Sequence, residues 1–337
     1  MLKKAIPVLV ILLGILFQCY AQEHTKKFKL LVPEQKALQS YYSSIRFIDS
    51  RSDTSAMGFV QTGMFNARAA VVAEPAFSTQ LKDVFITLTD SNAVKKELLF
   101  QLRELRFSEL TQSMSEKGTF SFRASLYAVE NNNYRCIATI DTICILKSGI
   151  DVTNRLLKKS SNVIIDFLSA NLSVKPLDSL LYTMSDIVKI DSIEKQSLKL
   201  YNASDFVPGL YTTYQFFVKQ SPDAQISVKE KDGGVNEVHS LNSDGKQQKI
   251  KLKNVYAIVH NGKPYVATEY GYYPLNKRND DFFYTGKIKV TASFGDILAA
   301  SMFGVLGTIL AGDANSVYEI KMDHVNGNLI PVKLIEK

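Results

Sequence analysis

Alternating hydrophobic and polar residues at the start of the chain predict strands. Ile45 and Phe47 alternate with polar neighbours, and Val60 follows after a stretch rich in serine and aspartate. This pattern is typical of strands that flank a polar turn. We therefore expect the N-terminal half to begin with β-structure.

Two longer alternating runs, 119–130 and 134–149, lie on either side of three consecutive asparagines. Asparagine adopts a positive φ more readily than most residues, as a tight hairpin turn requires. The two runs therefore predict a β-hairpin.

A helix is predicted from Asp90 to Phe107, because the apolar residues there are spaced by four, four and three positions. They are Val94, Leu98, Leu102 and Leu105. Asp90 would be the N-cap of this helix.

A second helix is predicted after Asp151, which is a good N-cap residue. Val152, Leu156, Val163 and Phe167 would face the core. Strands, a helix, a hairpin and a second helix together predict a compact α+β domain over residues 22–171.

The region 172–200 reads as a linker with a short helix, and 201–337 as a β-rich domain. Two strands are expected on either side of Asn261-Gly262, because Asn-Gly is a strong hairpin signal. Further strands are expected at 287–293, 316–323 and 329–337, the last two joined by a turn. The fold class is thus α+β, with an apolar Gly/Ala-rich helix or helical hairpin inserted in the β-rich domain.

That inserted segment, 294–312, is sorted by side-chain size rather than by polarity. On a helix, its large residues would lie on one side and its small residues on the other. The small face holds two small-x-x-x-small pairs, formed by Ala300, Gly304, Gly307 and Ala311. This spacing lets another backbone approach closely. Three readings stay open: burial in the protein's own domain, which we favour, contact with a second copy or another protein, and peripheral contact with lipid.

The first 21 residues predict a secretory signal peptide, because a charged start is followed by an apolar run and by small residues before a cleavage point at Ala21. The apolar run is shorter than the roughly 20 residues needed to cross a bilayer. Cys19 raises the alternative of lipidation, which Gln18 disfavours. The chain is therefore expected to be exported, to the periplasm or the outer membrane.

Charge argues against nucleic acid as a partner. Removing residues 1–21 takes away Lys3 and Lys4 and lowers the net charge from +7 to +5, which is too small for a nucleic-acid-binding surface. The remaining cysteines, Cys136 and Cys144, would lie about 26 Å apart on one extended strand at ~3.3 Å per residue. A disulfide between them is therefore not expected.

Sequence motifs for catalysis, metal or cofactor binding are absent. The four histidines, His24, His239, His260 and His324, are isolated from one another and from cysteine in the sequence. No nucleotide-binding, nucleophile-elbow or zinc motif occurs. We therefore expect no enzyme activity, no cofactor and no metal, and we read His260 as a hairpin-end residue.

Two stretches are weak candidates for ligand contact. Asp49 and Arg51 alternate onto one strand face, where an ion pair is the simplest expectation and an anion site at Arg51 is the alternative. The aromatic stretch that contains Tyr270, Tyr272 and Tyr273 is a candidate platform for a sugar or a peptide. Aromatic residues are also what strands prefer, so this signal is weak.

Two resemblances agree with export. The strand carrying Asp49 and Arg51 resembles the start of small bacterial envelope lipoproteins. The C-terminal half is similar to uncharacterised secreted proteins of bacteroidetes, through Gly209, Tyr211 and Phe216, with Pro222 and the strand pair at 255–266 following. These resemblances imply a compartment and a fold, and they imply no catalytic residue.

Our leading hypothesis is an exported, non-enzymatic envelope protein that acts through interaction or assembly, with an envelope protein or a second copy as partner. The alternative is an envelope hydrolase or ligand-binding protein that uses a cleft between the two domains. A pocket that joins Arg51 or His260 to several carboxylates would favour the alternative.

Overall fold

The computed structural model describes residues 24–34, 39–63, 67–89, 93, 96–112, 115–149, 151–177, 180–241, 247–287 and 316–336. The expected signal peptide and the apolar segment 294–312, with its candidate face Ala300, Gly304, Gly307 and Ala311, lie outside these residues. Within the described part, no helix has both the length and the apolar composition needed to cross a bilayer.

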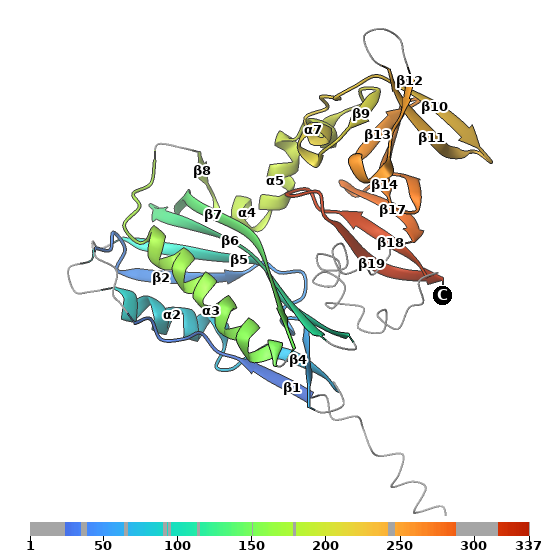
Figure 1. Ribbon diagram of the computed structural model, residues 1–337. Coiled ribbons are helices and arrows are strands. Elements are labelled where there is room, and N and C mark those ends of the chain that lie inside the picture. The colour runs from blue at the N-terminus through green and yellow to red at the C-terminus, as the bar shows by residue number, and fades with distance from the viewer. Residues whose placement is uncertain are drawn as a thin grey trace, which may run out of the picture.

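A five-stranded sheet in the order β2-β5-β6-β7-β8 organises the N-terminal half (Figure 1). Its strands are β2 (Ser44–Asp49), β5 (Glu97–Gln112), β6 (Ser115–Glu130), β7 (Asn133–Ser148) and β8 (Leu181–Tyr182). β2 pairs in parallel with β5, and the remaining pairs are antiparallel. β8 pairs only with Tyr134 and Arg135 at the start of β7.

Two helices and a small sheet cover one face of this sheet. The helices are α2 (Phe77–Leu88) and α3 (Val152–Asn171), and the small sheet contains β1 (His24–Phe28), β4 (Ala67–Ala73) and β3 (Phe59–Thr62). Leu98, Phe100 and Phe122 of the large sheet join Phe85 and Leu156 of the helices in one buried core. The opposite face of the sheet is turned toward the C-terminal half.

The helix predicted from Asp90 to Phe107 is wrong, because residues 97–112 form the strand β5. Residues four positions apart lie on the same face of a helix and also on the same face of a strand, so Leu98 and Leu102 fit both. A β-bulge between Leu102 and Glu104 then shifts the alternation by one residue and brings Leu105 to the core face as well. The helix α2 lies before this region, at Phe77–Leu88, and the sequence analysis did not predict it.

The predicted hairpin and the second predicted helix are confirmed. β6 and β7 are joined at Asn131 and Asn132, whose φ angles are 50° and 65°. α3 begins after Asp151, whose side chain accepts a hydrogen bond from the Asn154 backbone N–H. Cys136 and Cys144 are both free thiols on β7.

Short helices occupy the region expected to be a linker. They are α4 (Met184–Val188), α5 (Ile190–Ser197) and α6 (Lys199–Asn202). Ile187 of α4 is fully buried against Leu99 and Tyr127 of the large sheet. Lys195 of α5 pairs with an aspartate of the C-terminal half. This region therefore packs against both halves of the protein.

Three sheets form the C-terminal half. The first contains β10 (Ile226–Lys231), β11 (Gly234–Leu241) and β12 (Gln247–Lys249). The second contains β15 (Gly271–Pro274), β14 (Lys263–Thr268), β13 (Ala257–His260) and β9 (Gly209–Tyr211). The third contains β16 (Asn276–Arg278), β17 (Asp281–Lys287), β18 (Val317–Met322) and β19 (Leu329–Glu336). Two short helical elements, α7 (Tyr214–Val218) and the 3-10 helix at Leu252–Asn254, complete it.

The hairpins expected in this half are confirmed. β13 and β14 are joined by Asn261 and Gly262, both with positive φ. β18 and β19 pair in antiparallel fashion, and Asp323 at the end of β18 begins the turn between them. The α+β class is therefore correct at the level of mixed helices and sheets.

Candidate functional site

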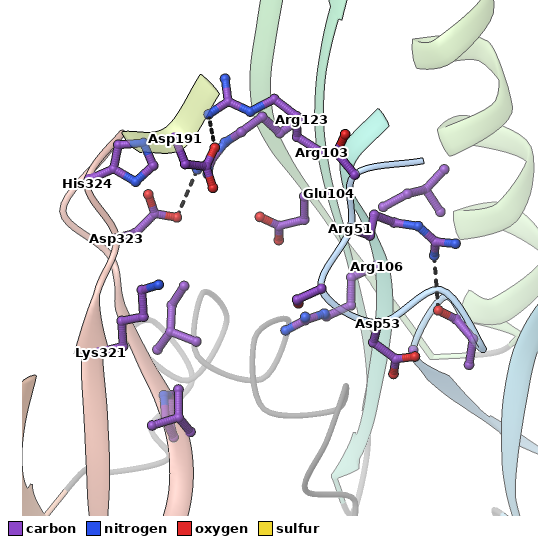
Figure 2. A pocket seen from close by; sticks show the side chains of 18 residues that line it. Arg51, Asp53, Arg103, Glu104, Arg106, Arg123, Asp191, Lys321, Asp323 and His324 are labelled. Atoms are coloured by element: carbon purple, nitrogen blue, oxygen red, sulfur yellow. Dashed lines mark hydrogen bonds and ion pairs between the residues drawn. The ribbon is translucent and has the colours of Figure 1, made fainter. Parts of the chain in front are cut away.

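A cleft of about 400 Å³ lies between the two halves of the protein (Figure 2). One wall is formed by β5, β6 and the loop after β2, and the other by α5 and the β18–β19 hairpin. Ten ionisable residues line it: Arg51, Asp53, Arg103, Glu104, Arg106, Arg123, Asp191, Lys321, Asp323 and His324. Its volume is within the range of ligand pockets, roughly 300–1,000 Å³.

The bulge in β5 determines which side chains enter the cleft. Leu102 pairs with Ala124 and Glu104 with Arg123, so Arg103 is the extra residue between them. Leu102 and Leu105 face the core on either side of the bulge. Arg103, Glu104 and the buried Arg123 therefore lie on the opposite face, toward the C-terminal half. Bulges often direct a side chain in this way.

Arg123, on the N-terminal sheet, forms an ion pair with Asp323 of the C-terminal half at the wall of the cleft. Its Nη2 lies 2.9 Å from Oδ2 of Asp323, and its Nε lies 2.9 Å from Oδ1 of Asp141. Asn326, in the turn after Asp323, donates a hydrogen bond of 2.9 Å to the other oxygen of Asp141. Burial alone would lower the pKa of Arg123, but Asp323 and Asp141 outweigh it and raise the pKa.

A second charged cluster forms around Arg103. Its guanidinium lies 2.5 Å from Asp191 and 2.6 Å from Glu194, two acids one turn apart on α5. Nε2 of the buried His324 lies 2.9 Å from Glu194. Burial would raise the pKa of Glu194, but hydrogen bonds from His324 and Arg103 lower it to about 2.

This cluster also contains a candidate set of metal ligands. Three possible ligand atoms lie within 4.8 Å of one another: a carboxylate oxygen of Asp191, a carboxylate oxygen of Glu194 and a ring nitrogen of His324. Arg103 already bonds both carboxylates, so the positive charge that a metal would supply is provided by the protein itself. We therefore interpret the cluster as an ion-pair network and assign no metal to it.

The loop after β2 places Arg51 and Asp53 in the same wall of the cleft as β5 and β6. Arg51 forms the ion pair with Asp49 expected from the sequence, with Nε–Oδ1 and Nη2–Oδ2 distances of 2.9 and 2.8 Å. Gly58 ends the loop at a φ of +82°, and an added Cβ there would lie 2.1 Å from the carbonyl oxygen of Phe107. This close approach fixes the loop against β5.

Lys321 on β18 completes the charged lining. Its ammonium lies 2.7 Å from Oδ2 of Asp281, whose Oδ1 lies 2.6 Å from the buried Lys195. Burial would raise the pKa of Asp281, and the two lysines lower it. Lys321, like Arg51, Arg103 and Arg123, is therefore neutralised by an acid of the protein.

Glu104 differs from the other charged groups that face the cleft. Its carboxylate points into the space between Asp323 and Arg106 in Figure 2. Across the described parts of the chain, no hydrogen bond or ion pair engages this carboxylate. Burial raises its pKa, Arg106 and Arg123 act in the opposite direction, and Asp323 and Asp141 add to the rise.

The other ligand candidates from the sequence do not gather at this cleft. Tyr270 is exposed at the turn between β14 and β15. Tyr272 packs with one apolar cluster, whereas Tyr273 packs with another and stacks on Tyr284 at a ring distance of 5.3 Å. Neighbouring residues of a strand point to opposite faces, so Tyr272 and Tyr273 do not form one platform. His260 ends β13, as expected, and contacts Glu230.

The sequence reading selected Arg51 but missed Arg103, Glu104, Arg123 and Asp323 as site residues. It also called His324 isolated, whereas the fold brings it to Glu194. The helix predicted for this region gave no reason to place Arg103 and Glu104 at a site. The adjacent charged pair interrupts the alternation of Phe100, Leu102 and Leu105, and this interruption was the available signal for a bulge.

No protein-family model matches the chain, and no curated protein matches it. Among solved structures, it is similar to protein XCC0632 from Xanthomonas campestris, described with the family-model name DUF330. The aligned residues are 10% identical and cover 43% of this chain and 95% of that chain, with a TM-score of 0.29. A TM-score this low does not establish a shared fold.

Proposed function

We propose that this chain is an exported, non-enzymatic binding protein of the cell envelope, which holds a small polar ligand in the cleft between its halves. The observation that carries the proposal is Glu104, a carboxylate that faces the cleft without a hydrogen-bond partner in the described structure. Glu104 is partly buried and desolvation raises its pKa, so a ligand that donates hydrogen bonds to this carboxylate would offset the cost of its desolvation. A cleft that joins Arg51 to several carboxylates also favours ligand binding over a purely structural role.

The charges of the cleft select the class of ligand. Arg51, Arg103, Arg123 and Lys321 each pair with an acid of the protein. Among the described residues, no ion pair engages the carboxylate of Glu104; Arg106 and Arg123 favour its charged form, whereas burial, Asp323 and Asp141 oppose it. A protonated amine supplies both the positive charge and the hydrogen-bond donors that this carboxylate lacks. The ligand is therefore a small molecule that carries an ammonium group.

The arrangement supports binding better than hydrolysis. Ser50 of the cleft wall accepts a hydrogen bond from Gln101, and the ring of His324 contacts Glu194. In the described part of the cleft, neither group is bonded to the other as a nucleophile and its base would be. An envelope hydrolase remains the alternative, and release of product from an amide or ester of the bound amine would support it.

The cellular setting of the proposal comes from the sequence. The signal-like residues 1–21 support export to the periplasm or the outer membrane. Fractionation of cells that express the full chain tests this part separately: cleavage after Ala21 and recovery in the envelope fraction are expected. Recovery of the uncleaved chain in the cytoplasm would contradict export and would leave the cleft proposal to its own test.

Thermal denaturation and calorimetry with defined amines test the cleft proposal. We expect lysine, putrescine or ethanolamine to raise the melting temperature of the wild type, whereas matched neutral alcohols do not. Glu104→Gln should abolish the shift, because the amide keeps the shape of the side chain but removes its charge. Glu34→Gln, at an exposed acid, is the matched control and should bind as the wild type does. Binding that survives in Glu104→Gln, or no shift with any amine at millimolar concentration, would contradict the proposal.

A further inference from the structure

The outer edge of β7 is open over most of its length in the described structure. β8 pairs with Tyr134 and Arg135 only, and β7 continues for thirteen residues beyond Arg135, to Ser148. Within the described residues, the backbone of 137–147 forms no hydrogen bond to any strand other than β6. An open edge of this length exposes a row of backbone donors and acceptors on which another strand can pair.

The residues along this edge lack the usual protection against pairing. Natural edge strands carry charged side chains, proline or bulges that prevent association. Between Ile140 and Ser148, the charged residues are Asp141 and Lys147, and no proline or bulge occurs there. Ile145 is 41% exposed on the same edge. The edge is thus long, apolar and rich in β-branched residues, as a strand that pairs would be.

We propose that a second copy of this chain pairs with β7 in antiparallel fashion across a two-fold axis at Cys144. In this register, Ile140 lies opposite Ser148 of the second copy, and Thr142 lies opposite Leu146. Ile143 lies opposite Ile145, and each Cys144 lies opposite the other. The pairing stops before Asp151, where α3 is capped, and it leaves the β8 pair at Tyr134 and Arg135 intact.

Charge complementarity selects this register and this occupant. Lys147 lies opposite Lys117 within the monomer, and burial together with Lys147 lowers the pKa of Lys117. In the described structure, no ion pair involves Lys147. The two-fold register places Lys147 of each copy opposite Asp141 of the other, on the same face of the extended sheet. Lys147 thereby lies opposite an acid that Arg123 and Asn326 of the second copy also contact, and opposite charges across strands stabilise a sheet.

The same register makes a prediction about cysteine chemistry. Residues directly opposite in an antiparallel pair have Cα atoms about 4.5–5.5 Å apart, which is within the range of a disulfide. The two copies of Cys144 would therefore be close enough to cross-link. Diamide takes one hydrogen from each of the two thiols, so a disulfide forms and diamide is reduced to the hydrazine.

Sedimentation equilibrium of the purified chain is the first measurement, and we expect a reversible dimer. Lys147→Glu brings two acids together in each half of the interface and should weaken the dimer at least tenfold. Lys251→Glu, at an exposed lysine in the C-terminal half, is the matched control and should leave dimerisation unchanged. Circular dichroism establishes that both variants are folded.

Cross-linking tests the register. In a Cys19→Ser, Cys136→Ser background, diamide should give a covalent dimer, and adding Cys144→Ser should abolish it. A monomer at all concentrations would overturn the proposal. Protection of the β7 amides from hydrogen exchange in such a monomer would not rescue it, because another part of the same chain would then cover the edge. A dimer that resists Lys147→Glu and does not cross-link through Cys144 would overturn it as well.

Discussion

Arg123 and Asp323 form a buried ion pair of 2.9 Å between residues separated by 200 positions in the sequence. Arg123 belongs to the N-terminal sheet, and Asp323 begins the turn between the last two strands. The pair therefore fixes the C-terminal hairpin against the sheet and defines one wall of the cleft.

Removing Asp323 leaves Arg123 buried with Asp141 as its remaining ion-pair partner among the described residues. Loss of one partner of a buried pair costs about 3–5 kcal/mol, and we expect Asp323→Ala to fall near the lower end because Asp141 stays. Urea denaturation measures the change in the free energy of unfolding. The control is Lys27→Gln in the exposed pair with Glu74, which should change stability by less than about 1 kcal/mol. Equal effects of the two substitutions would contradict the structural role of Arg123–Asp323.

Glu104→Gln should stabilise the protein at neutral pH, opposite to the usual effect of a substitution. The folded state raises the pKa of Glu104, so folding favours the protonated carboxyl and ionisation costs stability. The loss of stability begins as the pH rises above 4.5, the ordinary pKa of a glutamate, and grows until the pH passes the raised pKa of the folded state. Each kcal/mol relieved corresponds to roughly 2–4 °C in melting temperature for a domain of this size. The advantage of the variant should vanish below pH 4, and a constant advantage at every pH would contradict this explanation.

Glu194 should show the opposite pH dependence. Its folded pKa is about 2, below the ordinary value of 4.5, so the ionised form is favoured by folding. The stability it contributes is complete above about pH 4.5 and is lost as the pH falls toward 2. Glu194→Gln should therefore flatten the acid limb of the stability curve, measured by urea unfolding at a series of pH values. An unchanged slope between pH 4.5 and 2 would show that Arg103 and His324 do not hold Glu194 as described.

Gly58→Ala should destabilise the protein more than Gly63→Ala. Both glycines have positive φ, at +82° and +72°, so alanine is strained at either position by about 1 kcal/mol. A Cβ at Gly58 also meets the Phe107 carbonyl oxygen at 2.1 Å, whereas nothing lies within 4 Å at Gly63. We expect the clash to add about 1–3 kcal/mol and to weaken amine binding, because the loop with Arg51 and Asp53 must move. Equal losses in both variants would contradict the close approach of this loop to β5.

The sequence by itself determined the features that depend on a few neighbouring residues. Asn131 and Asn132 supply the positive φ angles of the β6–β7 turn, Asp151 caps α3, and Arg51 bonds Asp49 two residues away. In each case the residue types and their spacing fix the interaction, because both partners lie within one turn or one strand end.

Tertiary structure alone decided the strand β5 and the cleft. Leu98 and Leu102 suit a helix and a strand equally, and pairing with β2 and β6 selected the strand. The bulge at Arg103 then turned Glu104 toward the C-terminal half, and the fold brought Asp323 to Arg123 across 200 positions. Such contacts depend on which distant segments pair, and local periodicity carries no information about that choice.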